Sequence, residues 1–285
     1  MTAGELDRLA DILNAVIREF AVAAEDDAAS IGPLSGPVIS EQREASAVID
    51  ALVAAEDLYH VELAEDRARA RVAERRQKTW NLEEEGRQAA ERIWSRSVPI
   101  EGTPASTYLE SRGLCVPSPS PYLRYCSRLW NRELAQWCHG LVAAVTKWPG
   151  SEVWAVHRIF LSDDGRAKAA VTKPKMTLGP FGTGAVRLGE ASRTIAVGEG
   201  LETCLAVQQS TGIRTWAAIG TSNMKTLILP PVAQHVVVLA DHDEAGKKAA
   251  RIAAERWVLE GRRVEIALPP TEGSDFADLL VERTA

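Results

Sequence analysis

Three acidic residues stand where their carboxylates could meet and bind a cation. Asp241 and Asp243 lie one residue apart, directly after the apolar run 235–240, and Glu199 follows a second apolar run within the sequence VGEG. Two carboxylates a few ångströms apart repel each other unless a proton or a cation lies between them. Oxygen ligands of this kind suit Mg²⁺ or Mn²⁺. We therefore predict a metal site made of Glu199, Asp241 and Asp243, with these three residues also as the catalytic set.

The same residues also have a purely structural interpretation. Acidic side chains at the start of a helix cap free N–H groups and oppose the helix dipole. For Glu199 the metal site is favoured, because Asp241 and Asp243 alone would leave that site half built. For Glu202, three residues further on, capping and function stay equally open. Near the C-terminus, Asp275 and Asp278 could either cap a terminal helix or take a peripheral part in metal binding.

The elements that must position these acids alternate between strand and helix. Four short apolar runs indicate strands, and two longer segments with helical spacing lie between them. An alternation of this kind predicts parallel strands joined by right-handed crossovers. The acids then meet at the carboxyl ends of the strands, where open α/β sheets bind ligands. The expected strands are 194–197, 214–218, 236–240 and 264–268, and the expected helices are 200–209 and 244–260. Strand alternation would point Asp241 and Asp243 the same way.

A basic segment precedes these elements. Between Gly165 and Gly189 the chain carries five basic residues and no acidic one. Lysines on a surface are often simply solvated, but the position of this segment ahead of the acidic strand ends favours contacts with phosphate. The candidates for binding nucleic acid or nucleotide are Arg158, Arg166, Lys168, Lys173, Lys175, Arg187 and Lys247. Trp148 and Trp154 are candidates for stacking on bases.

Composition is that of an ordinary globular chain. The 285 residues are 46% hydrophobic and 25% charged, with a formal net charge of -6. That charge argues against a protein that is basic all over, although a local basic groove can coexist with it. The four cysteines include no CxxC pair, which argues against a zinc ribbon and favours a reduced, cytoplasmic chain. No signal peptide or membrane span is visible, so we expect no membrane partner.

Amino-acid composition and residue pattern divide the chain into three regions. Residues 1–96 are rich in Ala, Glu and Arg and are predicted to be helical, with one long helix over 40–77 after a Gly/Pro break at 31–37. Residues 97–190 are predicted to form a mixed α+β basic subdomain. Within it we expect a helix that begins at Thr103-Pro104 and stops at Gly113, and strands at 141–145, 153–160 and 185–188. Residues 191–285 hold the acidic α/β part.

Four ordered motifs resemble the Toprim domain that topoisomerases and bacterial-type primases share. They are AVGEGLETCLA, WAAIGTSN, LADHDEAGKKAA and LPPTEGSDFADLL. The glycine-threonine turn at Gly220 and the Asp-x-Asp followed by Ala245 and Gly246 match the primase pattern directly. Glu202 departs from it, one place earlier than the second acid of many primases. The resemblance spans about 194–280 and implies a Rossmann-like parallel sheet with flanking helices.

The middle of the chain extends the likeness. VHRIFLSDDGRAK and KPKMTLGPFGTGAVRL are similar to the basic, strand-rich subdomain that precedes Toprim in primases, where lysines and arginines hold template and incoming nucleotide. IWSRSVPIEGTPASTYLESRGL resembles the corresponding region of phage and plasmid primase-like proteins. Those relatives often add a zinc module and a helicase, and this sequence shows neither pattern.

The resemblance implies a metal-dependent nucleotidyltransferase of the primase type, which makes short primers on single-stranded DNA from NTPs for phage or plasmid replication. A replicative helicase is then an expected partner. A Toprim nuclease that cuts phosphodiesters is one alternative. A non-catalytic DNA-binding adaptor, which needs a helicase or zinc-module partner, is another. A topoisomerase is less favoured, because the chain is short and its four tyrosines lie in no recognisable nucleophile setting.

Overall fold

The computed structural model describes residues 37–116, 120–270 and 276. The chain divides into two compact units, 1–75 and 76–285, and helix α2 (Pro37–Arg96) contributes residues to both. This helix runs nineteen residues beyond the predicted end at residue 77, because the sequence from 78 to 96 contains no proline to end it. The Gly/Pro break lies almost wholly outside the described residues. The division at residues 96 and 190 stays a prediction.

Within 76–285, the first described sheet is antiparallel. Its strands follow the order β1 (Leu123–Asn131), β2 (Gln136–Thr146), β3 (Val153–Phe160) and β4 (Lys175–Leu178). Strand β3 has the predicted bounds. Strand β1 was not predicted, since its charged residues and a register shift between Cys126 and Leu129 break the regular alternation.

The two faces of this sheet pack against different parts of the same unit. Val156 and Phe160 of β3 face the C-terminal turns of α2, where they meet Ala90 and Ile93. The alternate residues of β3 share a core with α3 and with the second sheet. Helix α3 (Pro104–Ser111) begins as predicted, because the hydroxyl of Thr103 caps it by accepting from the Ala105 N–H at 3.2 Å.

The second described sheet is mixed. Its order is β5 (Val186–Arg187), β7 (Arg214–Ala217), β6 (Thr194–Gly198), β8 (His235–Leu239) and β9 (Arg263–Ala267). The last four are mutually parallel, as predicted. Strand β5, which was expected as a strand of the preceding subdomain at 185–188, instead joins this sheet and runs antiparallel to β7. The fold is therefore an antiparallel sheet with an N-terminal helix, followed by an α/β sheet.

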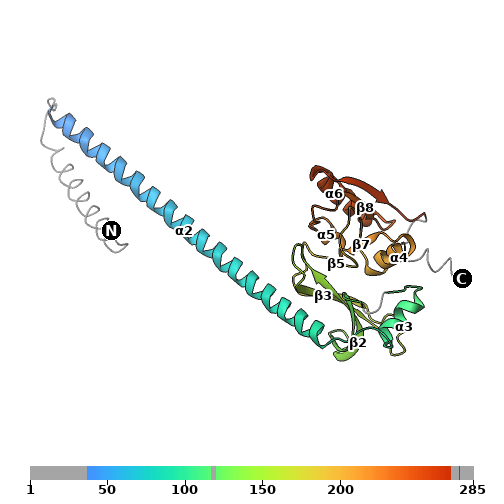
Figure 1. Ribbon diagram of the computed structural model, residues 1–285. Coiled ribbons are helices and arrows are strands. Elements are labelled where there is room, and N and C mark those ends of the chain that lie inside the picture. Colours follow the sequence, from blue (N-terminus) through green and yellow to red (C-terminus); the bar gives the residue numbers. More distant parts are fainter. Residues whose placement is uncertain (1–36, 117–119, 271–275, 277–285) are drawn as a thin grey trace. The chain divides into compact units, whose positions relative to one another are not determined.

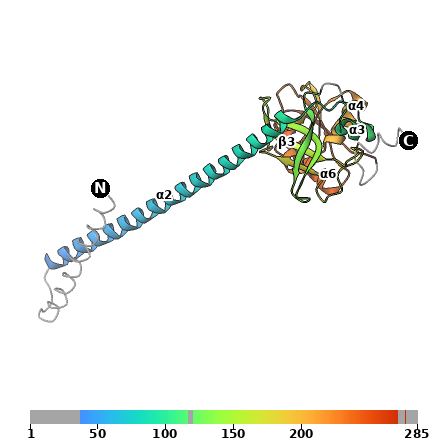
Figure 2. The ribbon, with the colours of Figure 1, turned by 90° about the horizontal axis from the view of Figure 1, so that it is seen from below.

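Helices cover both faces of the mixed sheet (Figures 1 and 2). Helix α4 (Leu201–Thr211) lies on one face, and α5 (Thr221–Met224) and α6 (Glu244–Leu259) lie on the other. This arrangement leaves the carboxyl ends of β6 and β8 at an edge where loops can approach. None of the described helices combines the length and apolar character needed to cross a membrane.

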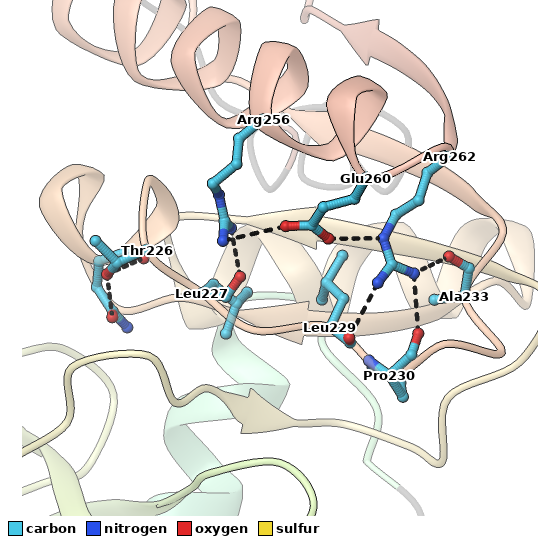
Figure 3. A network of polar contacts seen from close by, with 9 residues as sticks. Thr226, Leu227, Leu229, Pro230, Ala233, Arg256, Glu260 and Arg262 are labelled. Carbon is cyan, nitrogen blue, oxygen red and sulfur yellow. Dashed lines mark hydrogen bonds and ion pairs between the residues drawn. The ribbon is translucent and has the colours of Figure 1, made fainter.

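An arginine network anchors the C-terminal end of α6 (Figure 3). Glu260 pairs with Arg256 at 3.4 Å and with Arg262 at 3.1 Å. The Arg262 guanidinium also donates to the carbonyls of Leu229 and Pro230, and Arg256 donates to that of Leu227. These contacts satisfy carbonyls of the loop between α5 and β8. They hold α6 in place, and with it the acidic residues at its other end.

Candidate functional site

Glu199 and Asp241 follow two neighbouring parallel strands. Gly198 of β6 pairs with Leu239 of β8 at the ends of these strands, so the residues that follow emerge side by side at one edge. Asp243 lies two residues beyond Asp241. Because β8 ends at Leu239, strand alternation does not set the directions of Asp241 and Asp243, contrary to the sequence-based argument. The turn into α6 positions them instead.

The charges of Asp241 and Asp243 act on the carboxyl group of Glu199. Burial raises the pKa of the half-buried Glu199 carboxyl, and the negative charges of Asp241 and Asp243 raise it further. Lys175 and a hydrogen bond from the Thr221 backbone N–H act in the opposite direction on this pKa. A cation beside Glu199 would relieve the repulsion that the three acids create.

Asp243 also caps α6. Its side chain accepts a hydrogen bond from the Gly246 N–H at 2.7 Å, which satisfies a free donor in the first turn. The cap uses one carboxylate oxygen. Asp243 is therefore a helix cap whose charge also acts on Glu199, and its role in metal binding stays a prediction.

Gly246 lets the first turn of α6 approach Asp241 closely. A Cβ on Gly246 would lie 2.7 Å from the Asp241 carbonyl oxygen and 3.2 Å from the Asp241 Cβ. No larger residue fits without moving that backbone. The glycine of the DEAG sequence thus fixes the position of the aspartate five residues before it.

The glycine-threonine turn fixes Glu199 from the other side. Ile219 adopts a φ of 61° and Gly220 a φ of 140°, and the Ile219 N–H donates to the Glu199 carbonyl at 2.9 Å. The N–H of Thr221 then reaches the Glu199 carboxylate. The glycine is needed because its φ lies in a region that residues with a Cβ rarely adopt.

A cavity of about 220 Å³ opens beside Glu199. His157, Lys175 and Thr177 of the antiparallel sheet line it, together with Glu199 and Gly220 from the turns that follow β6 and β7. His157 Nδ1 lies 3.1 Å from the Thr177 hydroxyl. Burial, helped by the charge of Lys175, lowers the pKa of His157 to about 4. The cavity thus offers a neutral imidazole and a lysine next to Glu199.

Glu202, whose role the sequence left open, is the centre of a buried polar network. Its side chain accepts from the Tyr108 hydroxyl, and its carboxylate lies 2.8 Å from the Lys168 ammonium and 3.9 Å from that of Lys175. Burial alone would raise the pKa of Glu202, but the hydrogen bonds from Lys168 and Tyr108 outweigh it and hold this pKa below its usual value. Glu202 is thus ionised and held by residues of α3, of β4 and of the segment between β3 and β4.

The predicted phosphate-binding residues fall into two groups. Lys175 lines the cavity, and Lys168 lies close to it through their common partner Glu202. Arg166 and Lys173 are exposed on the segment between β3 and β4. These four residues remain predicted contacts for nucleotide or nucleic acid.

The other three predicted phosphate-binding residues, Arg158, Arg187 and Lys247, have contacts within the fold. Arg158 is buried on β3, beside Phe160 and on the sheet face opposite to the cavity. Arg187 donates to the Gly150 carbonyl at 2.7 Å and lies over the Trp216 ring. Lys247 pairs with Glu244 on α6 at 3.5 Å. None of these placements tests a contact with nucleic acid, so the three assignments stay predictions.

Sequence reasoning missed several residues of the site. Tyr108 lies 94 residues from Glu202 along the chain, and Thr177 enters the cavity only through the pairing of β4 with β3. No local motif marks either residue. Asp275 and Asp278 lie outside the described residues.

Among the described residues, no three His, Cys, Asp or Glu side chains gather closely enough to enclose a metal ion by themselves. An open set of this kind still fits Mg²⁺, which keeps several waters and takes one or two carboxylates together with substrate phosphates. The oxygen-only donors Glu199, Asp241 and Asp243 match that preference. Any metal held here would therefore use water or substrate for its remaining ligands.

Comparison with known proteins agrees with this geometry. Residues 194–285 match the Toprim domain, and residues 84–188 match a domain of unknown function, DUF7146. The similarity to the Toprim domain thus covers the acidic α/β part of the chain. No curated protein sequence matches the chain.

Solved structures of bacterial primases are similar to this chain. A DNA primase domain from Pseudomonas aeruginosa is 19% identical, with a TM-score of 0.46 over 70% of this chain and 74% of its own. The zinc-binding and RNA polymerase domains of the Aquifex aeolicus primase are 18% identical, with a TM-score of 0.49 over 68% of this chain. The RNA polymerase domain of the Mycobacterium tuberculosis primase DnaG is 18% identical, with a TM-score of 0.37 over 61% of this chain. The match covers 57% of each of the latter two chains.

Proposed function

We propose that this protein is a primase-type nucleotidyltransferase that joins nucleotides into short primers on single-stranded DNA. Phage or plasmid replication is the setting in which we expect it to act. The observation that carries the proposal is that Glu199 and Asp241 follow the paired ends of β6 and β8, beside a cavity that Glu199 and Lys175 both line.

The acidic residues would hold Mg²⁺ or Mn²⁺, which supplies positive charge to the triphosphate and the leaving pyrophosphate. Glu199 is fixed by the Gly220 turn, and Asp241 is fixed by its contact with Gly246. Phosphoryl transfer depends on positioning and charge neutralisation more than on a covalent nucleophile. The hydrogen bond that holds Glu199 and the close approach of Gly246 to Asp241 support such positioning.

Lys175 would bring a positive charge to a phosphate in the cavity. It lies near enough to Glu199 to influence that carboxylate, and its ammonium is 3.9 Å from Glu202. Lys168, held by Glu202 at 2.8 Å, would add a second charge nearby. His157 stays neutral at physiological pH because of its lowered pKa, so it would donate or accept a hydrogen bond without adding charge.

The test is an incubation of the full chain with end-labelled single-stranded DNA and labelled NTPs, with Mg²⁺ or Mn²⁺, read on a denaturing gel. New short labelled oligonucleotides that need both NTPs and template support primer synthesis. Shortening of the labelled DNA without NTPs would identify a nuclease instead. Binding without either product, followed by synthesis once a replicative helicase is added, would favour an adaptor.

A further inference from the structure

An exposed pair of tryptophans stands at the end of the β1–β2 hairpin. Trp130 and Trp137 are directly paired across the two strands, with ring centroids 5.4 Å apart and ring planes at 69°. Their exposed fractions are 45% and 51%. Leu129, the residue before Trp130, is by contrast fully buried in the core on the other face. The two large rings therefore lie on the surface.

The turn that carries these rings is held firmly. Asn131 is buried, and its side-chain oxygen accepts from the backbone N–H groups of Glu133 at 3.0 Å and Leu134 at 3.1 Å. These two bonds satisfy donors that a hairpin turn leaves without ladder partners. A ligand that docked on the rings would meet a surface already ordered, which lowers the entropic cost of binding.

The surroundings of the pair are basic. The Arg128 guanidinium lies 4.9 Å from the centre of the Trp137 ring, and Arg96 donates to the Arg128 carbonyl. Arg132 is exposed in the turn. The nearby acid Glu133 accepts two bonds from the Thr172 backbone N–H and one from its hydroxyl, so its charge is directed to that segment. The face around the rings thus suits a polyanion.

The pair also lies on the sheet face that carries the cavity residues. Trp137, His139, Leu141 and Ala143 alternate onto the same face of β2, and Ala143 pairs with His157 on β3. Six residues of strand separate Trp137 from Ala143, which corresponds to about 20 Å at about 3.3 Å per residue. A strand of nucleic acid could reach across this distance.

We propose that Trp130, Trp137 and Arg128 form a stacking surface for single-stranded DNA, in which unpaired bases lie on the exposed indole rings and phosphates meet the arginine. Stacking of this kind tolerates any base, because every base has a π face. The proposal deepens the proposed function and rests on it. It names a place where the template is held at a distance from Glu199, Asp241 and Asp243.

The experiment measures the affinity of the full chain for fluorescein-labelled oligothymidylate by anisotropy, without NTPs or metal. Trp137→Leu removes the π face and is expected to weaken binding by between about 5-fold and about 150-fold. Trp137→Phe retains a ring and is expected to bind closer to wild type than Trp137→Leu does. Trp80→Leu is the matched control, because Trp80 is 61% exposed on α2.

Salt dependence separates the two parts of the surface. Arg128→Gln should lower the slope of log affinity against log salt by about 0.7, and Trp137→Leu should leave this slope unchanged. Melting temperatures of all variants are measured alongside, with binding compared well below the lowest of them. Equal loss in the Phe and Leu variants would mean that hairpin packing, not stacking, matters, and would overturn the proposal.

DNA binding by the Trp137 variants tests the stacking surface, and primer synthesis by wild type tests the proposed function, so the two can fail separately. Unchanged DNA binding in Trp137→Leu overturns the stacking surface even if wild type makes primers. Weakened DNA binding in Trp137→Leu, with Trp137→Phe close to wild type, supports the surface even if wild type makes no primers. In that second case the proposed function would fail on its own.

Discussion

The ammonium of Lys168 lies 2.8 Å from the carboxylate of Glu202, although the first belongs to the segment between β3 and β4 and the second to α4. A lysine predicted to bind phosphate therefore also joins the antiparallel sheet to the Toprim domain. Tyr108 of α3 and Lys175 of β4 contact the same carboxylate, which makes Glu202 the common partner of three residues far apart in the sequence.

Glu202→Gln should destabilise the protein. The substitution keeps the shape of the side chain but removes the charge that holds Lys168 and Lys175. We expect the free energy of unfolding to fall by about 1–3 kcal/mol, the range for a hydrogen bond to a charged group, reduced by the partial exposure of the lysines. Urea denaturation measures it. Glu255→Gln, at an exposed position of α6, is the control and should change stability by less than about 0.5 kcal/mol.

His157 should make stability depend on pH. Its pKa is lowered from 6.5 to about 4, so between these values the unfolded chain binds a proton that the folded chain does not. The free energy of unfolding therefore falls as pH drops through this window, by at most about 1.4 kcal/mol per pH unit from this group. Urea denaturation at pH 7, 6 and 5 should show a shallower dependence for His157→Gln. Identical pH dependence in both proteins would contradict the assignment.

Two substitutions of Asp243 should distinguish its helix cap from the effect of its charge on nucleotide incorporation. Asn is as good a helix cap as Asp, so Asp243→Asn should keep the melting temperature, while Asp243→Ala should cost about 1 kcal/mol. Both variants lose the charge that acts on Glu199, so both should lose most nucleotide incorporation. Full activity in Asp243→Asn would show that Asp243 is a cap alone.

Gly246→Ala should reverse the usual effect of this substitution in a helix. Alanine is normally favoured over glycine there by about 1 kcal/mol. Here the added Cβ would lie 2.7 Å from the Asp241 carbonyl oxygen, and such overpacking costs about 1–3 kcal/mol. We expect lower stability and weaker incorporation, because Asp241 must shift. Gly182→Ala is the control, since a Cβ at Gly182 meets no atom within 4 Å. A more stable Gly246→Ala protein with normal activity would refute the close approach.

Sequence reasoning reached the acidic edge because its signals are local. An apolar strand that ends shortly before an acid can be read without knowing the fold, and the parallel pairing of β6 and β8 then brings Glu199 near Asp241. The Glu202 network could not be read this way. Its partner Tyr108 comes from α3, and only the packing of that helix beside α4 places the two side chains together.

Strand β1 was missed for a related reason. The register shift between Cys126 and Leu129 and the arginines of this strand hide its alternation, so the Trp130–Trp137 pair could not be foreseen. Trp148 and Trp154 were candidates for stacking on bases, and that role stays a prediction. In the structure Trp154 lies under the Lys147 ammonium, 4.2 Å from its ring centre. Cross-strand pairing, which depends on long-range contacts, decides which rings are presented together.

The most direct test compares nucleotide incorporation by wild type and Asp241→Asn, purified in parallel and shown to have matching melting temperatures. Both are incubated with single-stranded DNA, labelled NTPs and Mg²⁺ or Mn²⁺. If Asp241 belongs to a metal-dependent site, wild type makes short, template-dependent labelled products and Asp241→Asn makes none. Equal products from the two proteins would contradict the assignment of Asp241 to the metal-dependent site.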